Sequence, residues 1–299
     1  MSSIISLLTA NQIAGLSPAT VSAFTTTDID SLSTTQVHAL TGAQVNALNT
    51  TDLNELSAPQ VAALSTSVMS TLLAAQAQAF TATQITNLTA AQVGALTAAN
   101  IGILTTTELQ GLNSTQIGGL TAAQIGTLTT TVLDNLTSTQ VGLLNATQVH
   151  GLTASQLNNV ATATLNELDA SKLAAAQISG LTTTSVTNLT STQIGSLTAA
   201  EVGALTAADL NTLTTTEIGA FTATQAAALT ASQIAGIDPS NFVALSSTTG
   251  IPSLSVSAIT GLTTTEISNL TTTQGSAFTS TQIVSMSIAQ VTALVDLVG

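Results

Sequence analysis

Residues 88–119 read LTAAQVGA LTAANIGI LTTTELQG LNSTQIGG, which is four versions of one eight-residue unit. With the positions of this octad numbered 1 to 8, position 1 is Leu or Phe and position 6 is mostly Ile, Val or Leu. Position 2 is nearly always Thr, Ser, Asn or Asp, position 5 is mostly Gln, Glu or Asp, and Gly is common at position 7. Each unit therefore carries two large apolar side chains and two polar side chains at fixed positions.

The octad covers almost the whole chain of 299 residues. Three runs of 20, 9 and 5 units each keep one register, and they begin at Leu8, Leu173 and Leu254. The register shifts at 168–173, where a unit lacks three residues, and at 246–254, where one residue is inserted. An internal period of this kind is the signature of a repeat architecture. We predict one octad-repeat solenoid over residues 1–299, with a kink or joint at the first register break.

The polar positions of the octad match the start of an α-helix. Side-chain oxygens at position 2 suit an N-cap, because they accept hydrogen bonds from backbone N–H groups that lack helical partners. Gln or Glu three residues later completes a capping box, and positions 1 and 6 then form the apolar pair of a hydrophobic staple. Gly at positions 7 and 8, as at Gly118 and Gly119, suits a left-handed residue that ends a helix. We therefore predict one short helix and one reversal of the chain per octad.

Departures from the consensus agree with this interpretation. Pro18 and Pro239 directly follow the position-2 residue, at the first helical position, where a missing N–H costs nothing. Half of the 14 acidic residues occupy position 5, in the first helical turn, where the helix dipole favours a carboxylate. These seven acids are Asp28, Asp52, Glu108, Glu201, Asp209, Glu217 and Glu266.

A single octad cannot be stable alone. Its two apolar side chains contribute about 1.5–3 kcal/mol each on burial, whereas ordering its residues costs about 1.5 kcal/mol apiece. The octads must therefore stack, as in solenoids whose neighbouring units supply the missing core, and Ala and Gly at positions 3, 4, 7 and 8 let backbones approach closely. The predicted fold class is an all-α solenoid of very short capped helices. A β-solenoid is the alternative, although positions 1 and 6 do not share a face under strict alternation.

The composition excludes several classes of function. One basic residue, Lys172, stands against 14 acidic ones, so the net charge of −13 excludes binding to nucleic-acid phosphates. The absence of Cys excludes disulfides and thiolate metal sites. An apolar fraction of 44% argues against disorder. Polar residues nevertheless interrupt every stretch of about 20 residues that a transmembrane helix would need.

No constellation of residues points to catalysis, so we predict no enzyme activity, catalytic residue, cofactor or metal site. His38 and His150 both occupy position 7, but they lie far apart in the sequence without a third ligand nearby, and we expect exposed substitutions there. Asp28 and Asp30 are close together without the remainder of a calcium-binding loop. The many Ser and Thr residues lack an adjacent base held by a third group. Acids stacked at position 5 would at most collect cations weakly.

The two ends of the chain predict self-association. Residues 4–8 and 291–299 are largely apolar, although solenoids normally end in polar capping repeats. Exposed apolar patches mark interaction sites, and a head-to-tail contact that does not close into a ring builds filaments. We therefore expect a structural homo-oligomer that forms head-to-tail filaments. Replacing Leu294 and Leu297 with Asp should then abolish assembly.

Octads of the LTAAQVGA type resemble the low-complexity repeats of bacterial surface and extracellular proteins. The C-terminal Val295-Asp296-Leu297-Val298 resembles the acidic and apolar tails of type I secretion substrates, which carry no N-terminal signal. The N-terminus also lacks the basic region of a secretory signal peptide. The resemblance implies an extracellular or cell-surface protein, such as a filament, sheath or surface-layer subunit, exported without an N-terminal signal peptide.

A second function stays open. Positions 2 to 4 carry runs of Thr, as at 105–107 and 214–216, that would form a regular hydroxyl face. Such a face suits a surface adhesin or a module that binds a lattice such as polysaccharide or ice. A β-solenoid would present a flat array of this kind more readily than short helices.

Overall fold

The computed structural model describes residues 3–299, which form helices and no strand. The chain divides into two compact units, Met1–Leu152 and Thr153–Gly299. Helices of the first unit are η1 Ile4–Leu7, α1 Ala10–Ala14, α2 Pro18–Val21, α3 Thr26–Ser31, α4 Thr34–Ala39, α5 Gly42–Ala47, α6 Thr50–Glu55, α7 Ala58–Ala63, α8 Thr66–Met69, α9 Ala74–Ala79, α10 Ala82–Thr86, α11 Ala90–Ala95, α12 Ala98–Gly102, α13 Thr106–Gly111, α14 Ser114–Gly119, α15 Ala122–Thr127, α16 Thr130–Asp134, α17 Ser138–Gly142 and α18 Ala146–Gly151.

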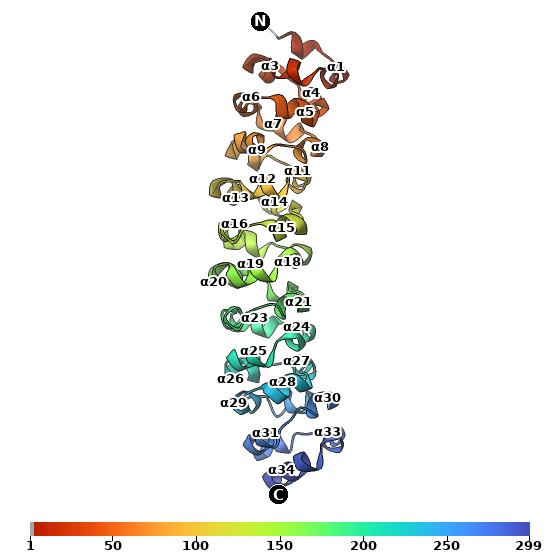
Figure 1. The fold of residues 1–299 in the computed structure, drawn as a ribbon, viewed down its shortest axis with the longest axis vertical. Coiled ribbons are helices and arrows are strands. Elements are labelled where there is room, and N and C mark those ends of the chain that lie inside the picture. The colour runs from red at the N-terminus through yellow and green to blue at the C-terminus, as the bar shows by residue number, and fades with distance from the viewer. Residues whose placement is uncertain (1–2) are drawn as a thin grey trace. The chain divides into compact units, whose positions relative to one another are not determined.

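The second unit continues the same series of short helices (Figure 1). Its helices are α19 Ala154–Asn159, α20 Thr162–Glu167, η2 Ala170–Lys172, α21 Ala175–Ile178, α22 Thr183–Thr187, α23 Ser191–Ser196, α24 Ala199–Ala204, α25 Ala207–Thr212, α26 Thr215–Gly219, α27 Ala223–Ala227, α28 Ala231–Gly236, α29 Pro239–Phe242, η3 Ile251–Ser253, α30 Val256–Ile259, α31 Thr264–Asn269, α32 Thr272–Gly275, α33 Ser280–Ser285 and α34 Ile288–Val298. The all-α solenoid is therefore confirmed, and the β-solenoid alternative is wrong for the described residues.

Helices begin where the capping box predicts. In α11, the backbone N–H of Gln92 donates to Thr89 Oγ1 at 3.2 Å, and the backbone N–H of Thr89 donates to Gln92 Oε1 at 2.8 Å. Thr89 itself is extended, with φ −72° and ψ 158°. The same reciprocal pair opens most of the α-helices, and Pro18 and Pro239 occupy first helical positions as predicted.

Helices end differently from the prediction. No residue in 3–299 has a left-handed backbone, and Gly118 and Gly119 lie inside α14. The helix ends instead at the extended Leu120, whose N–H donates to the carbonyl of Ile117 at 3.1 Å. Because positions 1 and 2 are both extended, two residues reverse the chain and no left-handed residue is needed. The assignment of position-7 and position-8 glycines as left-handed caps is wrong.

Glycine at position 8 instead lets neighbouring turns approach closely, as the sequence predicted for small residues. A Cβ atom on Gly119 would lie 2.4 Å from the carbonyl oxygen of Ala90, and one on Gly151 would lie 2.4 Å from that of Ala122. These glycines lie at the contacts of α11 with α14 and of α15 with α18.

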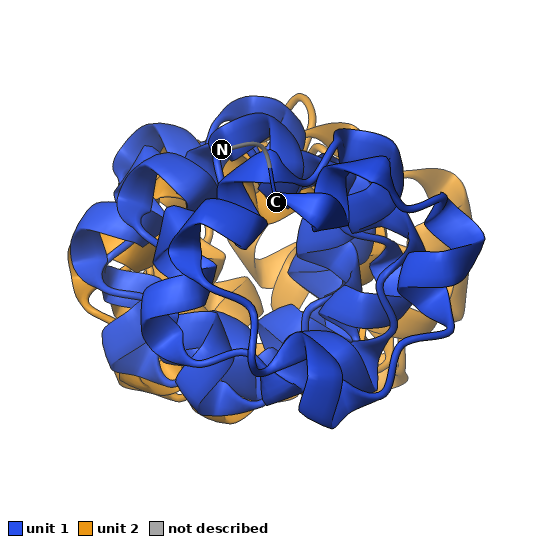
Figure 2. Ribbon diagram, turned by 90° about the horizontal axis from the view of Figure 1, so that it is seen from above, with its two compact units in different colours: residues 1–152 blue, residues 153–299 orange. Residues whose placement is uncertain are grey.

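In each unit, a helix packs against the helix three octads further along. Such contacts join α1 to α4, α4 to α7 and α6 to α9 in the first unit, and α21 to α24 and α25 to α28 in the second. Figure 2 shows the helices of residues 1–152 (blue) arranged around a ring in the end-on view. The apolar side chains of positions 1 and 6 are buried almost throughout, so they form the core that the staple predicts.

Both register breaks lie in the second unit, and each contains a 3₁₀ helix. η2 fills the shortened unit, where Lys172 Nζ lies 3.4 Å from Asp169 Oδ2 on the surface. η3 fills the unit with one inserted residue. The division between the compact units, after Leu152, does not coincide with either break.

Candidate functional site

The position-5 glutamine is buried and links successive turns of the solenoid. Gln44 is 1% exposed, and its Oε1 accepts from the backbone N–H of Thr41 at 2.7 Å. Its Nε2 donates to the carbonyl oxygens of Ile13 and Leu16, each at 2.8 Å, at the end of a helix in the preceding turn. One side chain therefore caps the start of its own helix and the end of another. We call this arrangement the glutamine clasp.

The clasp recurs along both units, with the same separations wherever the register is unbroken. In the first unit, Gln124 Nε2 donates to Val93 and Leu96, 31 and 28 residues earlier, at 2.9 and 2.7 Å. In the second unit, Gln193 bonds Leu165 and Leu168, 28 and 25 residues earlier, because the intervening octad lacks three residues. The register break therefore leaves the spatial contact unchanged. Sequence reasoning found the capping half of this residue and missed its donation to the preceding turn.

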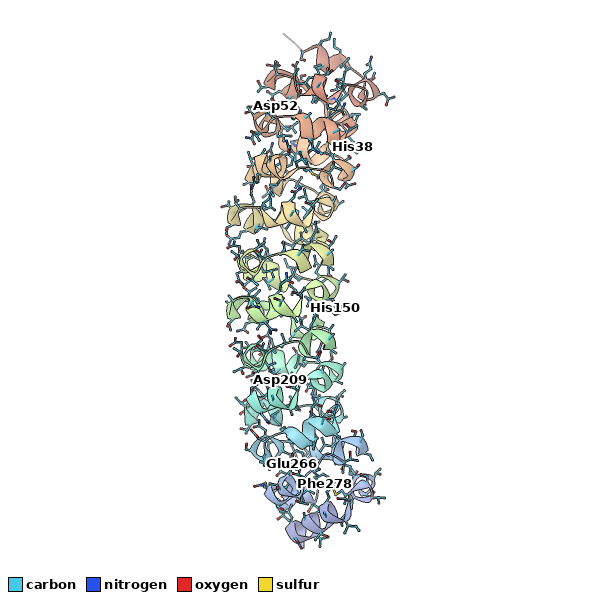
Figure 3. The ribbon with its side chains drawn as sticks, in the orientation of Figure 1. His38, Asp52, His150, Asp209, Glu266 and Phe278 are labelled. Atoms are coloured by element: carbon cyan, nitrogen blue, oxygen red, sulfur yellow. The ribbon has the colours of Figure 1, made fainter. Side chains whose placement is uncertain are left out.

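Position 7 provides a second link between turns. Asn46 Nδ2 donates to the carbonyl of Thr71 at 2.8 Å, and Asn46 Oδ1 accepts from the N–H of Leu73 at 3.2 Å. His38 is exposed, as predicted, but its Nδ1 also lies 3.0 Å from the carbonyl oxygen of Ala63. His150 is exposed at the same octad position. Figure 3 shows the two histidines on different turns.

All seven acids at position 5 complete a capping box, as predicted. Their environments differ: Asp52, Glu201, Asp209 and Glu266 are buried, whereas Asp28, Glu108 and Glu217 are partly exposed (Figure 3 labels Asp52, Asp209 and Glu266). The four buried carboxylates cannot contribute to a surface series that collects cations. Within residues 3–299, the structure brings together no group of three His, Cys, Asp or Glu that could hold a metal ion.

The balance between hydrogen bonding and burial sets the pKa values of three position-5 acids. The hydroxyl of Ser3 donates to Asp28, and Thr25 adds backbone and side-chain bonds, so the pKa of Asp28 lies below its ordinary value. Burial opposes ionisation of Glu217, but bonds from the N–H of Thr214 and from the hydroxyls of Ser191 and Thr214 outweigh it and lower the pKa. Burial dominates at Glu266 and raises its pKa, against the two bonds from Thr263.

Threonine runs are exposed at positions 2 to 4. Residues 105–107 and 214–216 all face solvent. The position-2 hydroxyls of Thr105 and Thr214 serve the caps of α13 and α26, which leaves positions 3 and 4 as the open hydroxyls. In the first unit, α3, α13 and α16 begin with Thr at positions 2 to 4 and α6 begins with Asn-Thr-Thr, and these four helices lie on the left side of Figure 1.

Exposed apolar side chains gather near the two ends. Of the ten large apolar residues exposed in 3–299, seven belong to η1, α33 or α34: Ile4, Leu7, Ile283, Val284, Ile288, Val295 and Val298. Ile288 and Val295 also line an open groove of about 330 Å³. We call Ile283, Val284, Ile288 and Val295 the C-terminal apolar patch.

Two residues that the sequence suggested as probes are not surface groups. Leu294 is buried, with 5% of its surface exposed. Leu297 is half-buried, and its Cδ2 would lie 2.8 Å from a Cβ atom added at Gly275. Substituting either residue would disturb the core, so Ile288 and Val295 are the appropriate probes of the surface.

Comparisons with known proteins leave the family open. No protein-family model and no curated protein sequence matches the chain. Among solved structures, the leucine-rich repeat-containing protein LegL7 of Legionella pneumophila aligns with 98% of this chain and 89% of its own, at 11% identity and a TM-score of 0.21. A TM-score this low does not establish a shared fold.

None of the helices in residues 3–299 combines the length and apolarity needed to cross a bilayer.

Proposed function

We propose that this chain is a structural, self-assembling repeat protein of the extracellular space or cell surface that associates head to tail into filaments. The observation that carries the proposal is the gathering of exposed apolar side chains near the ends, in η1, α33 and α34. Val284 and Ile288 are 86% and 89% exposed. Exposed apolar side chains that gather in one region are characteristic of protein–protein interfaces, and Ile288 and Val295 line one groove.

The repeat geometry supports a second copy of this chain as the partner. Within each unit, every turn packs on the preceding turn through the same contacts, so a turn supplied by another molecule meets a surface of the same kind. The first octad has a side-chain amide that could form a clasp with a second molecule. Gln12 Oε1 accepts hydrogen bonds from Thr9 at the start of α1, and Gln12 Nε2 donates to no described residue. The next two position-5 residues, Thr20 and Asp28, cannot reproduce a glutamine clasp, so the proposed contact is mainly apolar.

The extracellular location rests on the resemblance of the octads and of the 295–298 tail to exported bacterial proteins. The composition agrees with it, since a protein without Cys has no thiol to oxidise outside the cell. Export is tested by fusing residues 240–299 to a reporter and measuring secretion through a type I system. Retention of the reporter inside the cell would remove this part of the proposal.

Self-assembly is tested by negative-stain electron microscopy and sedimentation velocity over a concentration series. We expect wild-type filaments that lengthen with concentration, and their loss in the double variant Ile288→Asp/Val295→Asp. Val256→Asp is the matched control, because Val256 is exposed on α30, outside the patch. A monodisperse wild type at every concentration, or filaments in the double variant, would overturn the assignment.

The threonine runs support lattice binding as a second candidate. In the first unit, the helices that begin with these runs, α3, α13 and α16, lie on one side together with α6, which begins with Asn-Thr-Thr (Figure 1). Pull-down on crystalline polysaccharide and thermal hysteresis would measure this activity directly. The variant Thr106→Val/Thr107→Val should lose binding if these hydroxyls contact the lattice, and wild-type protein that binds neither surface removes the candidate.

A further inference from the structure

Glu266 occupies position 5 of its octad, where Gln233, Gln282 and Gln290 of the second unit form glutamine clasps. It follows Thr263 by three residues, and its Oε2 accepts from the backbone N–H of Thr263 at 2.6 Å and from the Thr263 hydroxyl at 2.8 Å. Only 2% of Glu266 is exposed. It therefore performs the capping half of the clasp from the same buried site as a glutamine.

The other half of the clasp requires a hydrogen atom. Gln233 Nε2 donates to Val202 and Leu205 at 2.8 and 2.7 Å, and Gln282 Nε2 donates to Ile251 and Leu254 at 2.9 and 2.8 Å. In these clasps the acceptors lie 31 and 28 residues before the glutamine. One extra residue is inserted at 246–254, so the equivalent acceptors for Glu266 lie 32 and 29 residues earlier. They are the carbonyl oxygens of Ile234 and Ile237, at the end of α28. An ionised carboxylate has no hydrogen to donate, and it would bring negative charge towards two carbonyl dipoles.

The helices packed around α31 carry no basic side chain among their described residues that could pair with a charge on Glu266. The packed helices α29 and α34, with the adjoining α28 and α30, carry two titratable groups among their described residues and N-caps: Asp238 and Asp296. Both are acidic and exposed, and the chain's one basic side chain, Lys172, lies at η2, where it pairs with Asp169. Burial raises the pKa of Glu266, in agreement with this setting.

We propose that Glu266 is a proton-operated clasp of the second unit. Protonated, its carboxyl group donates to the carbonyls of Ile234 and Ile237 as a glutamine amide does, and it holds the turn of α31 on that of α28. Ionised, it keeps only the cap of α31 and releases the preceding turn. Mild acidification therefore tightens this turn, independently of whether the protein assembles.

The sign of the effect follows from proton binding. A carboxyl whose pKa is raised on folding binds more protons in the folded state than in the unfolded state between the two pKa values. Its stabilising contribution is complete below the ordinary pKa of Glu and is lost as pH rises through the folded-state value. Glu217, at the same octad position, has a lowered pKa, so its contribution is present at neutral pH and disappears on acidification.

These opposite signs provide a matched pair of variants in the full chain. Glu266→Gln installs the consensus clasp, so its melting temperature should exceed that of the wild type by about 3 °C at pH 7.5 and match it near pH 4. Glu217→Gln should show the opposite pH dependence: its melting temperature relative to that of the wild type should rise on acidification, because the wild type then loses the contribution of the ionised carboxylate. An equal shift for Glu266→Gln at both pH values would overturn the proposal, because a merely structural difference does not titrate.

A second measurement reads the proton directly. The side-chain carboxyl ¹³C signal of Glu266, assigned by its loss in Glu266→Gln, should titrate above the ordinary range of Glu, whereas that of Glu217 should titrate below it. In the same samples, amide exchange of the cap residue Leu270 and of α31 should slow on acidification after correction for the intrinsic rate. A Glu266 signal that titrates at or below the ordinary range would contradict the proposal.

Discussion

The side-chain amide of Gln44 donates to the backbone carbonyl of Leu16, 28 residues earlier in the sequence, at 2.8 Å. The same relationship joins Gln92 to Leu64 and Gln148 to Leu120. Because the acceptor residue ends one octad helix and the donor begins another, this bond fixes how far the chain travels before it returns to the same side. The turn of the solenoid is therefore defined by hydrogen bonds as well as by apolar packing.

The donor half of the clasp is tested by Gln124→Glu. The substitution keeps an oxygen for the N–H of Thr121 but removes the hydrogens that bond Val93 and Leu96. We expect a loss of about 1–3 kcal/mol in the free energy of unfolding, the cost of burying an unsatisfied polar group, measured by urea denaturation at pH 7. Gln12→Glu is the control, because Gln12 occupies the same octad position with no such bonds. Equal losses in both variants would show that the donor half contributes nothing.

The close approach of α14 to α11 at position 8 is tested by two substitutions within α14. Gly119→Ala places a Cβ atom 2.4 Å from the carbonyl of Ala90, whereas Gly118→Ala meets nothing within 4 Å. The first variant should lose about 1–3 kcal/mol through overpacking. The second should gain about 0.5–1 kcal/mol because Ala favours helix over Gly. Thermal unfolding of both proteins checks the difference, and a stabilised Gly119→Ala would contradict the packing of α11 on α14.

A missing cap offers a stabilising substitution. Leu73 is the N-cap of α9, where its exposed side chain makes no cap bond, although Gln76 stands at the position of a capping-box partner. Leu73→Thr should raise stability by about 1 kcal/mol by supplying an acceptor for the N–H of Gln76. Thr89→Ala, which removes the cap of α11, should cost a similar amount. An unchanged urea midpoint for Leu73→Thr would indicate that α9 is held by other contacts.

The sequence predicted what is decided within one octad. Thr89 and Gln92 reveal the capping box, and the apolar positions reveal the core, because both depend on residues three to five apart. The turn of the solenoid depends on which carbonyls lie opposite the amide of Gln92, and those residues are about thirty positions away. One available signal was the preference for Gln over Glu at position 5, since either residue completes a capping box but only Gln also donates.

The errors have a similar physical origin. Gly118 and Gly119 suit a left-handed cap when one helix is considered alone, yet the extended Leu120 already ends the helix. What Gly119 accommodates is the backbone of Ala90 in another turn, which no local pattern shows. Likewise, the burial of Leu294 depends on its packing in the last turn, although its neighbours Val295 and Val298 are exposed as the apolar run suggested.

The first turn should be sensitive to acid through Asp28. The hydroxyl of Ser3 and the N–H and hydroxyl of Thr25 all donate to its carboxylate and lower its pKa. A carboxyl with a lowered folded-state pKa stabilises the protein above its ordinary pKa, and this contribution is lost as pH falls through the folded value. We therefore expect η1 to loosen at low pH, measured as faster amide exchange of Leu8 after correction for the intrinsic rate.

Ser3→Ala separates this bond from general acid effects. Removing the hydroxyl takes away the largest cause of the lowered pKa, so the ¹³C titration of Asp28 should move up towards the ordinary value for Asp. At neutral pH, Leu8 should exchange faster in the variant than in the wild type, and the two should converge below the folded-state pKa. Ser6→Ala is the control, because Ser6 Oγ donates to the backbone of Ser3 and not to Asp28. If Ser3→Ala leaves the Asp28 titration unchanged, the contact between η1 and α3 does not control the acid response of this turn.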